Sequence, residues 1–412
     1  MRVNAWGQVR CHGLHCYMPP SCVVIAVPGN AAWLIIPIPR RPMFPLPPKH
    51  LLLLATLGAL TATAACSHDG ANTVTLGAAG PLEQLNGVVT KQGIELAADE
   101  INASADWSSK RHLEILFADD SALGSRAAAI AQEFDTTQRV VAVIGHVNSG
   151  AMVAAAHLYD KHLVAVATTA TSPMLTGISP WTFRVIPSDS ANAISLAKFV
   201  TKLGQKRVAV LYENNAYGRG LAENFRKAYN GDVIAIDPID DSADQNFEPY
   251  VSWFKHEHAD LVFVAGTDRS GLAFLREARR QQLSAAIVGS DGWQALAPDP
   301  KAEGVYVTAP FSAQDPRPEV RAFVDAFQKR YHTLPEGHAA LAYDVTKMLA
   351  WAVVKVGPDR KKIRDFLASL TEENAFHGVT GPIRFRPDGD PIGKGMVLTR
   401  VHQGALQVEG TQ

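Results

Sequence analysis

The sequence predicts an α/β protein with two Rossmann-like lobes, each built on a parallel sheet that helices cover on both faces. Short apolar runs alternate with longer helix-like segments between residues 73 and 289, and repeated βα units of this kind form parallel sheets. The alternation pauses at Pro187 and Ser188 and then resumes, which indicates a second lobe. The length of 412 residues agrees with two domains, since a domain has about 150 residues.

The first series has four predicted strands separated by helices. The strands are expected at 73–79, 113–118, 140–144 and 163–167. A helix at about 87–102 has apolar residues at helical spacing on one side, namely Ile94, Ala97, Ala98 and Ile101. The next helix shows the same periodicity with Ala127, Ile130, Ala131 and Phe134. A further helix begins near Ala151.

The second series repeats this pattern, and the last hundred or so residues after it no longer alternate strand with helix. Its helices are expected at 191–203, 217–229, 247–256 and 271–281, and its strands at 207–212, 233–236, 261–265 and 286–289. From about Pro316 the sequence turns mainly helical, before β-rich segments at 383–385 and 396–401. This change predicts that the chain recrosses between the lobes and forms a multi-crossing hinge. We expect lobe I at 66–190 and 314–374, and lobe II at 191–313 and 375–412.

The first 65 residues differ in kind from the rest. They contain five basic residues and no acidic one, and they end in an uncharged, mostly apolar run before Cys66. That run is shorter than the roughly 20 residues of a membrane-spanning helix and fits a secretory signal. The junction resembles the lipobox of bacterial lipoproteins, although Thr63 stands where a branched apolar residue is usual. We expect residues 1–65 to be an extension plus signal peptide with its true start at Met43, cleaved before Cys66, which takes the lipid in the periplasm.

Cysteine and charge content argue against a metal site and nucleic acid. Cys11, Cys16 and Cys22 lie in the Pro-rich extension, where we expect no zinc site, and cleavage would leave Cys66 as the single cysteine. The net charge is −1, and loss of the basic extension makes the remainder more acidic. The longest basic run, 360–362, is typical of a solvated helix face. A chain without basic clusters is not expected to bind nucleic acid.

Two loops carry the strongest functional indication in the sequence. The segments 145–150 and 168–173 each follow an apolar strand, and the first leads directly into a helix. In open α/β sheets ligands bind at the carboxyl ends of strands, where N–H groups of the following helix point into the crevice. Small hydroxyl residues in both loops add donors, so the loops predict a cup for a small anion.

Several segments together resemble the type I periplasmic binding proteins, the leucine/isoleucine/valine-binding family of ABC transporters for branched-chain and hydrophobic amino acids. The resemblance runs over nearly the whole chain after residue 66 and rests on 80–81, 93–102, 143–146, 216–220 and 378–385. Each segment alone is weak, but their order and spacing are those of the family. The resemblance implies a receptor that closes two lobes around an amino acid.

The resemblance also implies roles for individual residues. Ser149, Thr169, Ala170 and Thr171 would surround the α-carboxylate of the ligand. In the second lobe Tyr217 would close over the ligand, and Asp291 would hold the α-ammonium. A buried carboxylate favours amino acids, because a ligand without the amine would leave its charge unpaired.

The chain departs from the family pattern at the side-chain pocket. Thr267 stands where the family has a tyrosine, followed by Asp268 and Arg269, and a first-lobe aromatic falls around Leu85. Two family cysteines correspond to the neighbourhoods of Ala122 and Asn148, so their disulfide is absent. Thr267 enlarges or polarises the pocket, which weakens any assignment of leucine as the ligand.

Each residue also has an alternative role. Ser149 is a possible helix cap, residues 168–172 an ordinary strand exit, Tyr217 a surface aromatic and Asp291 a turn residue. Two further residues are expected to have structural roles: Asp268 as a helix N-cap, and His146 as a loop residue or one behind the site. The segment 256–258 is expected to be a solvated helix end rather than a metal site.

Catalysis has little support in the sequence. It contains no Gly-x-Ser-x-Gly elbow, zinc-protease motif or phosphate loop, and Ser149 and His146 have no geometric reason to face each other. We expect no enzyme activity, no cofactor and no metal.

The expected function is that of a monomeric, lipid-anchored periplasmic receptor that captures a small amino acid of the branched-chain or hydrophobic type and delivers it to an ABC transporter permease. Two alternatives remain open: a short amide, urea or aromatic acid as cargo, and a sensory module.

Overall fold

The computed structural model describes residues 10–11, 14–15, 22–26, 33–37, 72–242 and 244–409. The chain forms two compact units, residues 1–68 and 69–412. In the first unit the described residues make two antiparallel pairs, β1 (Arg10–Cys11) with β2 (Leu14–His15), and β3 (Cys22–Ala26) with β4 (Trp33–Pro37). The expected signal run, Met43 and Cys66 lie outside the described residues.

The second unit contains the two lobes, and the first is built on a five-stranded parallel sheet. The strand order is β6-β5-β7-β8-β9. The strands are β5 (Thr73–Gly80), β6 (His112–Asp119), β7 (Val140–Ile144), β8 (Ala165–Ala167) and β9 (Thr182–Arg184). One face packs on α4 (Gly124–Thr136) and α5 (Ser149–Tyr159). The other packs on α2 (Leu85–Ala103), α11 (Gly337–Val356) and α12 (Arg360–Ala368).

The second lobe has a seven-stranded sheet whose first five strands are parallel. The order is β11-β10-β12-β13-β14-β17-β18. The strands are β10 (Arg207–Glu213), β11 (Asp232–Ile239), β12 (Leu261–Ala265), β13 (Ala286–Gly289), β14 (Tyr306–Ala309), β17 (Val397–His402) and β18 (Ala405–Val408). On one face lie α6 (Asp189–Lys202) and α7 (Ala216–Ala228). The other face packs on α8 (Glu248–His256), α9 (Asp268–Arg280) and η3 (Asp291–Leu296).

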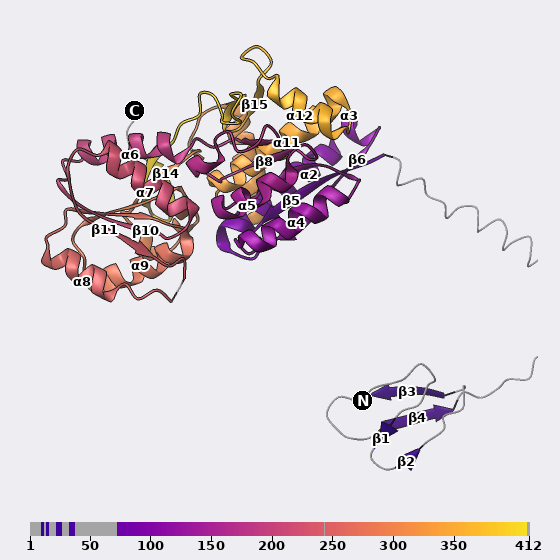
Figure 1. The fold of residues 1–412 in the computed structure, drawn as a ribbon, viewed down its shortest axis with the longest axis horizontal. Helices are drawn as coiled ribbons and strands as arrows, with labels where there is room; N and C mark the ends of the chain where they lie inside the picture. The colour runs from indigo at the N-terminus through magenta and orange to yellow at the C-terminus, as the bar shows by residue number, and fades with distance from the viewer. Residues whose placement is uncertain are drawn as a thin grey trace, which may run out of the picture. The chain divides into compact units, whose positions relative to one another are not determined.

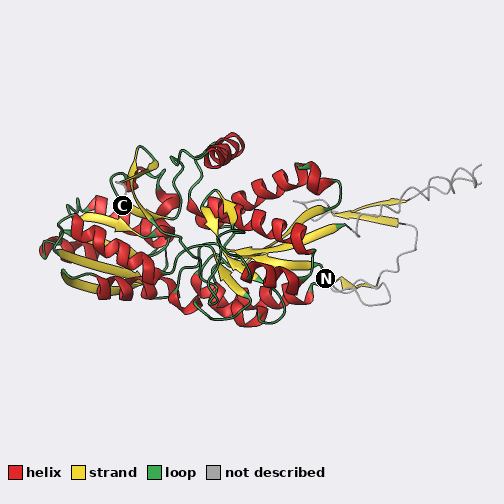
Figure 2. Cartoon of the chain, turned by 90° about the horizontal axis from the view of Figure 1, so that it is seen from above, coloured by secondary structure: helices red, strands yellow, loops and turns green. Residues whose placement is uncertain are grey.

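The remaining elements lie around these layers. They are α3 (Ala105–Ser108), η2 (Pro173–Leu175), η4 (Pro300–Ala302), α10 (Pro318–Tyr331), β15 (Phe376–Gly378) and β16 (Gly381–Ile383). Figure 2 shows helices on both faces of the sheets. The prediction of an α/β fold with parallel sheets covered on both faces is therefore confirmed.

The chain passes between the lobes at three places. It leaves the first sheet after β9, returns between β14 and α10, and leaves again before β17. The orange helices α11 and α12 therefore lie in the same lobe as the purple β5 and α2 (Figure 1).

The last crossing lies later in the chain than the sequence predicted. We expected lobe II to resume at residue 375, but Ile383, Phe385 and Met396 are buried in the core of the first lobe. Only residues from β17 onward pair with the second sheet. The difference arises because β15 and β16 form a separate two-stranded sheet whose Phe376 packs on the Trp351 ring of α11. Of the described residues, no helix combines the length and the apolar character that crossing a membrane requires.

Candidate functional site

A small cavity of about 30 Å³ lies where the two lobes meet. The first lobe contributes residues from the N-terminus of α2 and from the loops after β7 and β8, and the second lobe contributes residues that follow β10, β12 and β13. Of the seven predicted ligand residues, five line this cavity, namely Ser149, Thr169, Tyr217, Thr267 and Asp291. Ala170 and Thr171 are fully buried and do not line it.

Ser149 is the first residue of α5 and does not cap it. The N-cap position belongs to Asn148, whose side chain makes no capping hydrogen bond. The Ser149 hydroxyl instead accepts a 3.1 Å hydrogen bond from the Ser172 N–H. This bond joins the two predicted loops, and it leaves the hydroxyl hydrogen of Ser149 available. The open N–H groups of the first helical turn favour an anion at this position.

The loop after β8 presents backbone donors rather than hydroxyl donors. The Thr169 hydroxyl donates to the carbonyl of Val147 at 3.1 Å, so its hydrogen is already used. Within the described part of the chain, the N–H groups of Thr169, Ala170 and Thr171 donate to no acceptor. Of these three residues only Thr169 lines the cavity, so the first lobe can offer a carboxylate the Thr169 N–H, the open N–H groups at the start of α5 and the free Ser149 hydroxyl.

Arg184 supports this loop from inside the lobe. Its guanidinium is 2% exposed, and it donates to the carbonyls of Thr171 and Ser172 at 2.9 and 2.8 Å. It also donates from Nε to Asp390 at 2.6 Å. The carbonyls of the loop are therefore bound on the arginine side, and the loop is held by a segment from the last fifth of the chain.

The second lobe places a buried carboxylate in the cavity. Asp291 is 3% exposed, and its Oδ1 accepts a 2.8 Å hydrogen bond from the Tyr217 hydroxyl. Tyr217 is buried rather than a surface aromatic, and its oxygen accepts from the Gly292 N–H at 3.2 Å. Burial raises the pKa of Asp291, while the bond from Tyr217 opposes this rise. A cationic group in the cavity would compensate the charge.

Thr267 lines the cavity, but its hydroxyl is already hydrogen-bonded within the second lobe. Its N–H and its hydroxyl both donate to Oε1 of the buried Glu213, each at 2.7 Å, and Ser270 donates to the same oxygen at 2.7 Å. Glu213 thereby organises the start of α9. Thr267 is the N-cap residue of that helix, so the expectation that Asp268 caps it is wrong.

Four polar residues at or near the cavity were not among the site residues predicted from sequence. Asn86, Asp268 and His338 line the cavity, and Asp189 is a fully buried acid at the start of α6. Burial raises the pKa of Asp268 to about 6. Burial alone would lower the pKa of His338, but it is outweighed by the charge and hydrogen bond of Glu336, whose Oε2 lies 2.8 Å from His338 Nδ1, together with the charges of Asp291 and Asp268, so the pKa is raised. Asp189 has its pKa raised by burial and then by the charge of Asp291.

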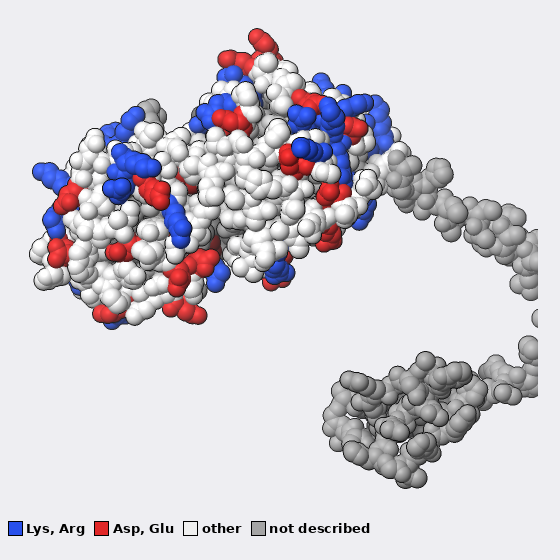
Figure 3. Space-filling view, in the orientation of Figure 1, with Lys and Arg blue, Asp and Glu red and all other residues white. Residues whose placement is uncertain are grey.

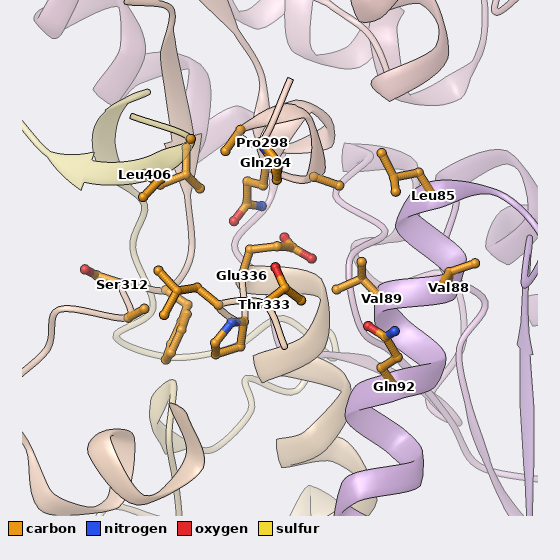
Figure 4. A pocket seen from close by; sticks show the side chains of 18 residues that line it. Leu85, Val88, Val89, Gln92, Gln294, Pro298, Ser312, Thr333, Glu336 and Leu406 are labelled. Atoms are coloured by element: carbon orange, nitrogen blue, oxygen red, sulfur yellow. The ribbon is translucent and has the colours of Figure 1, made fainter. Parts of the chain in front are cut away.

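A larger apolar pocket of about 300 Å³ adjoins the same region (Figure 4). Leu85, Val88 and Val89 of α2 lie on one side of it, and Leu406 lies opposite. Leu85, which the sequence placed near the side-chain pocket, lines this larger pocket and is 43% exposed. Its neighbour Asn86 lines the small cavity.

Ser149 and His146, the nearest candidates for a nucleophile and a base, do not form a catalytic pair. His146 is fully buried, with Nδ1 2.6 Å from Asp120 Oδ2 and Nε2 3.0 Å from the Tyr159 hydroxyl. It makes no hydrogen bond with Ser149.

Among the described residues there is no group of three or more His, Cys, Asp or Glu side chains placed to hold a metal ion. On the face shown in Figure 3, basic side chains are interspersed with acidic ones.

Comparison with known proteins agrees with this geometry. The family model described as "Periplasmic binding protein" matches residues 74–405. The leucine-, isoleucine-, valine-, threonine- and alanine-binding protein of Pseudomonas aeruginosa is 27% identical over 342 residues, which cover 80% of this chain and 89% of that protein. The branched-chain amino acid transporter substrate-binding protein LivJ of Streptococcus pneumoniae, solved with isoleucine, superposes with a TM-score of 0.75 at 26% identity over 82% of this chain and 98% of that one. An ABC transporter substrate-binding protein of Desulfitobacterium hafniense, solved with Leu, gives a TM-score of 0.69 at 29% identity over 82% of this chain and 100% of that one. The chain therefore belongs to the periplasmic binding protein family.

Proposed function

We propose that this protein is a periplasmic receptor of an ABC transporter that captures a small α-amino acid between its lobes and delivers it to a membrane permease. One observation carries the proposal. The Thr169 N–H, the open N–H groups at the start of α5 and the Ser149 hydroxyl of the first lobe share a cavity with the buried carboxylate of Asp291 from the second. Donors on one wall and an acid on the other suit a zwitterion.

The mechanism follows from the placement of these two charges. The first lobe holds the α-carboxylate, and the second lobe holds the α-ammonium through Asp291. Only a ligand with both groups bridges the lobes, so it binds the closed form better than the open form and shifts the equilibrium toward closure. The three crossings between the lobes act as the hinge. One chain supplies both walls, so the receptor works as a monomer.

The family match and the relatives named above support this proposal, because those relatives cover most of this chain and are named as amino-acid-binding or transporter substrate-binding proteins. The deep burial of Asp291 also favours an amino acid over an acid without an amine. An aromatic acid would leave this carboxylate without a counter-ion, which is costly in a buried site.

A thermal-shift screen of the purified protein tests the proposal. The ligands are the proteinogenic amino acids, with short amides, urea and aromatic acids as comparison classes. Stabilisation by at least one α-amino acid is expected, since a ligand at 100 times its Kd raises the unfolding free energy by about 2.7 kcal/mol. Stabilisation by none of them would contradict the proposal.

The membrane anchor is a separate part of the proposal. A signal cleaved before Cys66 leaves this cysteine at the mature N-terminus, where its thiol takes lipid. Labelled palmitate should enter the wild-type protein and not the Cys66→Ser variant, while binding of the amino acid stays unchanged in both. Equal labelling of the two proteins would rule out attachment at Cys66.

A further inference from the structure

The cavity wall is polar beyond the groups that would hold the α-carboxylate and α-ammonium. Its remaining lining includes Gln84, Asn86, Asn148, Asp268 and His338. Only Pro81 and Val147 of the lining residues have aliphatic side chains. A branched aliphatic side chain gains free energy by contact with apolar surface, and this wall offers little of it.

Asn86 presents a buried acceptor of known orientation. Its side-chain Nδ2 donates a 3.0 Å hydrogen bond across the lobes to the carbonyl of Gly292. Rotation of the amide by half a turn would set Oδ1 against that carbonyl, so the orientation is determined by the bond. Oδ1 is buried and has no hydrogen-bond partner. Asn148 Oδ1 is also buried without a partner.

Asp268 and His338 extend the same polar surface from the other lobe and from α11. The Asp268 residue is 7% exposed, and in the described part of the chain no other residue donates a hydrogen bond to its carboxylate. His338 uses Nδ1 for Glu336, and its Nε2 has no hydrogen-bond partner among the described residues. Buried polar groups are nearly always hydrogen-bonded, so the unpartnered oxygens of Asn86, Asn148 and Asp268 indicate a ligand that brings donors.

The apolar pocket of Figure 4 is lined by chain neighbours of these residues. Leu85 and Glu336 line the apolar pocket, whereas Asn86 and His338 line the small cavity. A ligand side chain in the small cavity therefore meets the amide and imidazole groups and not the leucine and valine side chains of α2.

From these contacts we infer that the ligand is an α-amino acid whose short side chain carries a hydrogen-bond donor. The donor is a hydroxyl, an amide N–H or an ammonium group, and Asn86 Oδ1 and Asp268 accept from it. The inference rests on the proposed function, and it sets this chain apart from a receptor for leucine, isoleucine and valine.

Threonine and valine provide the most direct test, because they have nearly the same shape and differ by a hydroxyl in place of a methyl group. Isothermal titration calorimetry on the purified wild-type protein is expected to give at least about tenfold tighter binding of threonine, since a site built for a donor rejects the analogue that lacks it. Asparagine and 2,4-diaminobutyrate, titrated in parallel, distinguish a neutral donor from a cationic one.

A variant assigns the preference to Asn86. Asn86→Leu removes the acceptor at similar volume and is expected to bring the threonine-to-valine ratio to within about threefold of one. Asn102→Leu is the matched control on α2, because Asn102 bonds to Leu113 through both amide atoms outside the cavity. That variant should keep the wild-type ratio.

The outcomes separate the two levels of the argument. Valine or leucine binding as tightly as threonine to the wild-type protein would overturn the inference and leave the amino-acid receptor standing. Binding of no α-amino acid would contradict the proposed function itself. The wild-type ratio decides the inference even if Asn86→Leu does not fold.

Discussion

The hydroxyl of Tyr217 lies 2.8 Å from Oδ1 of Asp291 and donates a hydrogen bond to it. The two residues are 74 positions apart in sequence, one at the start of α7 and the other at the start of η3. The bond orients the carboxylate, and no other residue of the described chain donates a side-chain hydrogen bond to its second oxygen. That oxygen is free for a ligand.

Replacing Asp291 by asparagine should weaken amino-acid binding strongly. Asp291→Asn keeps the size of the side chain but removes the charge that would pair with the ammonium group. A hydrogen bond to a charged group is worth about 1.5–3 kcal/mol, so calorimetry should show a loss of roughly 10- to 150-fold. The exposed Asp325→Asn variant serves as the charge-matched control. Unchanged affinity in Asp291→Asn would show that Asp291 does not hold the amine.

Tyr217→Phe should have a smaller effect than Asp291→Asn. The ring remains, but the carboxylate loses its orienting donor and the Gly292 N–H loses its acceptor. A loss of about 0.5–1.5 kcal/mol in binding free energy is expected, measured by the same titration. Tyr250→Phe, which alters a tyrosine outside the cavity, should leave affinity unchanged. A Tyr217→Phe variant that binds like wild type would mean that Asp291 needs no orientation by this hydroxyl.

Ser149 and Thr169 should differ in their contribution to binding. The Ser149 hydrogen is free, whereas the Thr169 hydrogen is donated to Val147. Ser149→Ala should therefore weaken binding of the carboxylate by about 1.5–3 kcal/mol, and Thr169→Val should change it by less than about 0.5 kcal/mol. Titration of one amino acid against both variants compares them directly. Equal losses would contradict the assignment of hydroxyl hydrogens.

Arg184→Met should destabilise the first lobe. The change removes the buried ion-pair partner of Asp390, which keeps only the half-exposed Arg386 as a cationic partner. It also removes one of the two donors from each of two loop carbonyls, those of Thr171 and Ser172. Breaking a buried ion pair by removing one member costs about 3–5 kcal/mol, and urea denaturation measures the loss. Arg386→Met removes a half-exposed arginine that also pairs with Asp390, and should cost no more than about 1 kcal/mol. Similar losses in the two variants would refute the special role of Arg184.

Stability should depend on pH through Asp268. Its pKa of about 6 in the folded state lies above the ordinary value of an aspartate, so the folded protein holds this proton more tightly than the unfolded chain. The stabilisation is complete at pH below the ordinary value and is lost as the pH rises through about 6.

Asp268→Asn should remove this part of the pH dependence. Relative to wild type, the variant should gain about 1–3 kcal/mol in unfolding free energy between pH 4.5 and pH 8, measured by urea denaturation at several pH values. Other buried acids with raised pKa, such as Asp189 and Asp344, keep a slope of the same sign in both proteins. Parallel curves for wild type and Asp268→Asn would contradict the prediction.

The regular elements were predictable because their signals are local. Apolar runs and helical periodicity depend on neighbouring residues, and β7, β12 and β13 have the predicted bounds. β9, β14, β15 and β18 were not predicted. They are short, and much of their stabilisation comes from pairing and packing with distant segments.

Some residues of the site were likewise predictable from the local sequence pattern, and others depend on contacts between distant segments. Ser149 and Thr169 follow strands whose carboxyl ends must meet at one sheet edge, so their neighbourhood follows from the βα pattern. His338 carries no such local signal, since it lies on α11 outside the strand-end loops. Asn86 lies at the start of α2, shortly after β5, so the βα pattern offered the same signal for it as for Ser149. Asp268 follows a predicted strand directly, and this position was the signal that was available for it.

The sequence by itself determined the α/β class, the two parallel sheets and the loops that line the cavity, because the apolar periodicity of strands and helices depends only on residues that are close together in the sequence. The tertiary structure alone decided which donors and acceptors at the cavity have no hydrogen-bond partner within the protein and can therefore bind a ligand. The Thr169 hydrogen is used within its lobe and the Ser149 hydrogen is not, and Asn86 Oδ1 is left without a donor. These facts depend on hydrogen bonds between distant segments, and the balance of free donors and acceptors in the cavity depends on all of them at once.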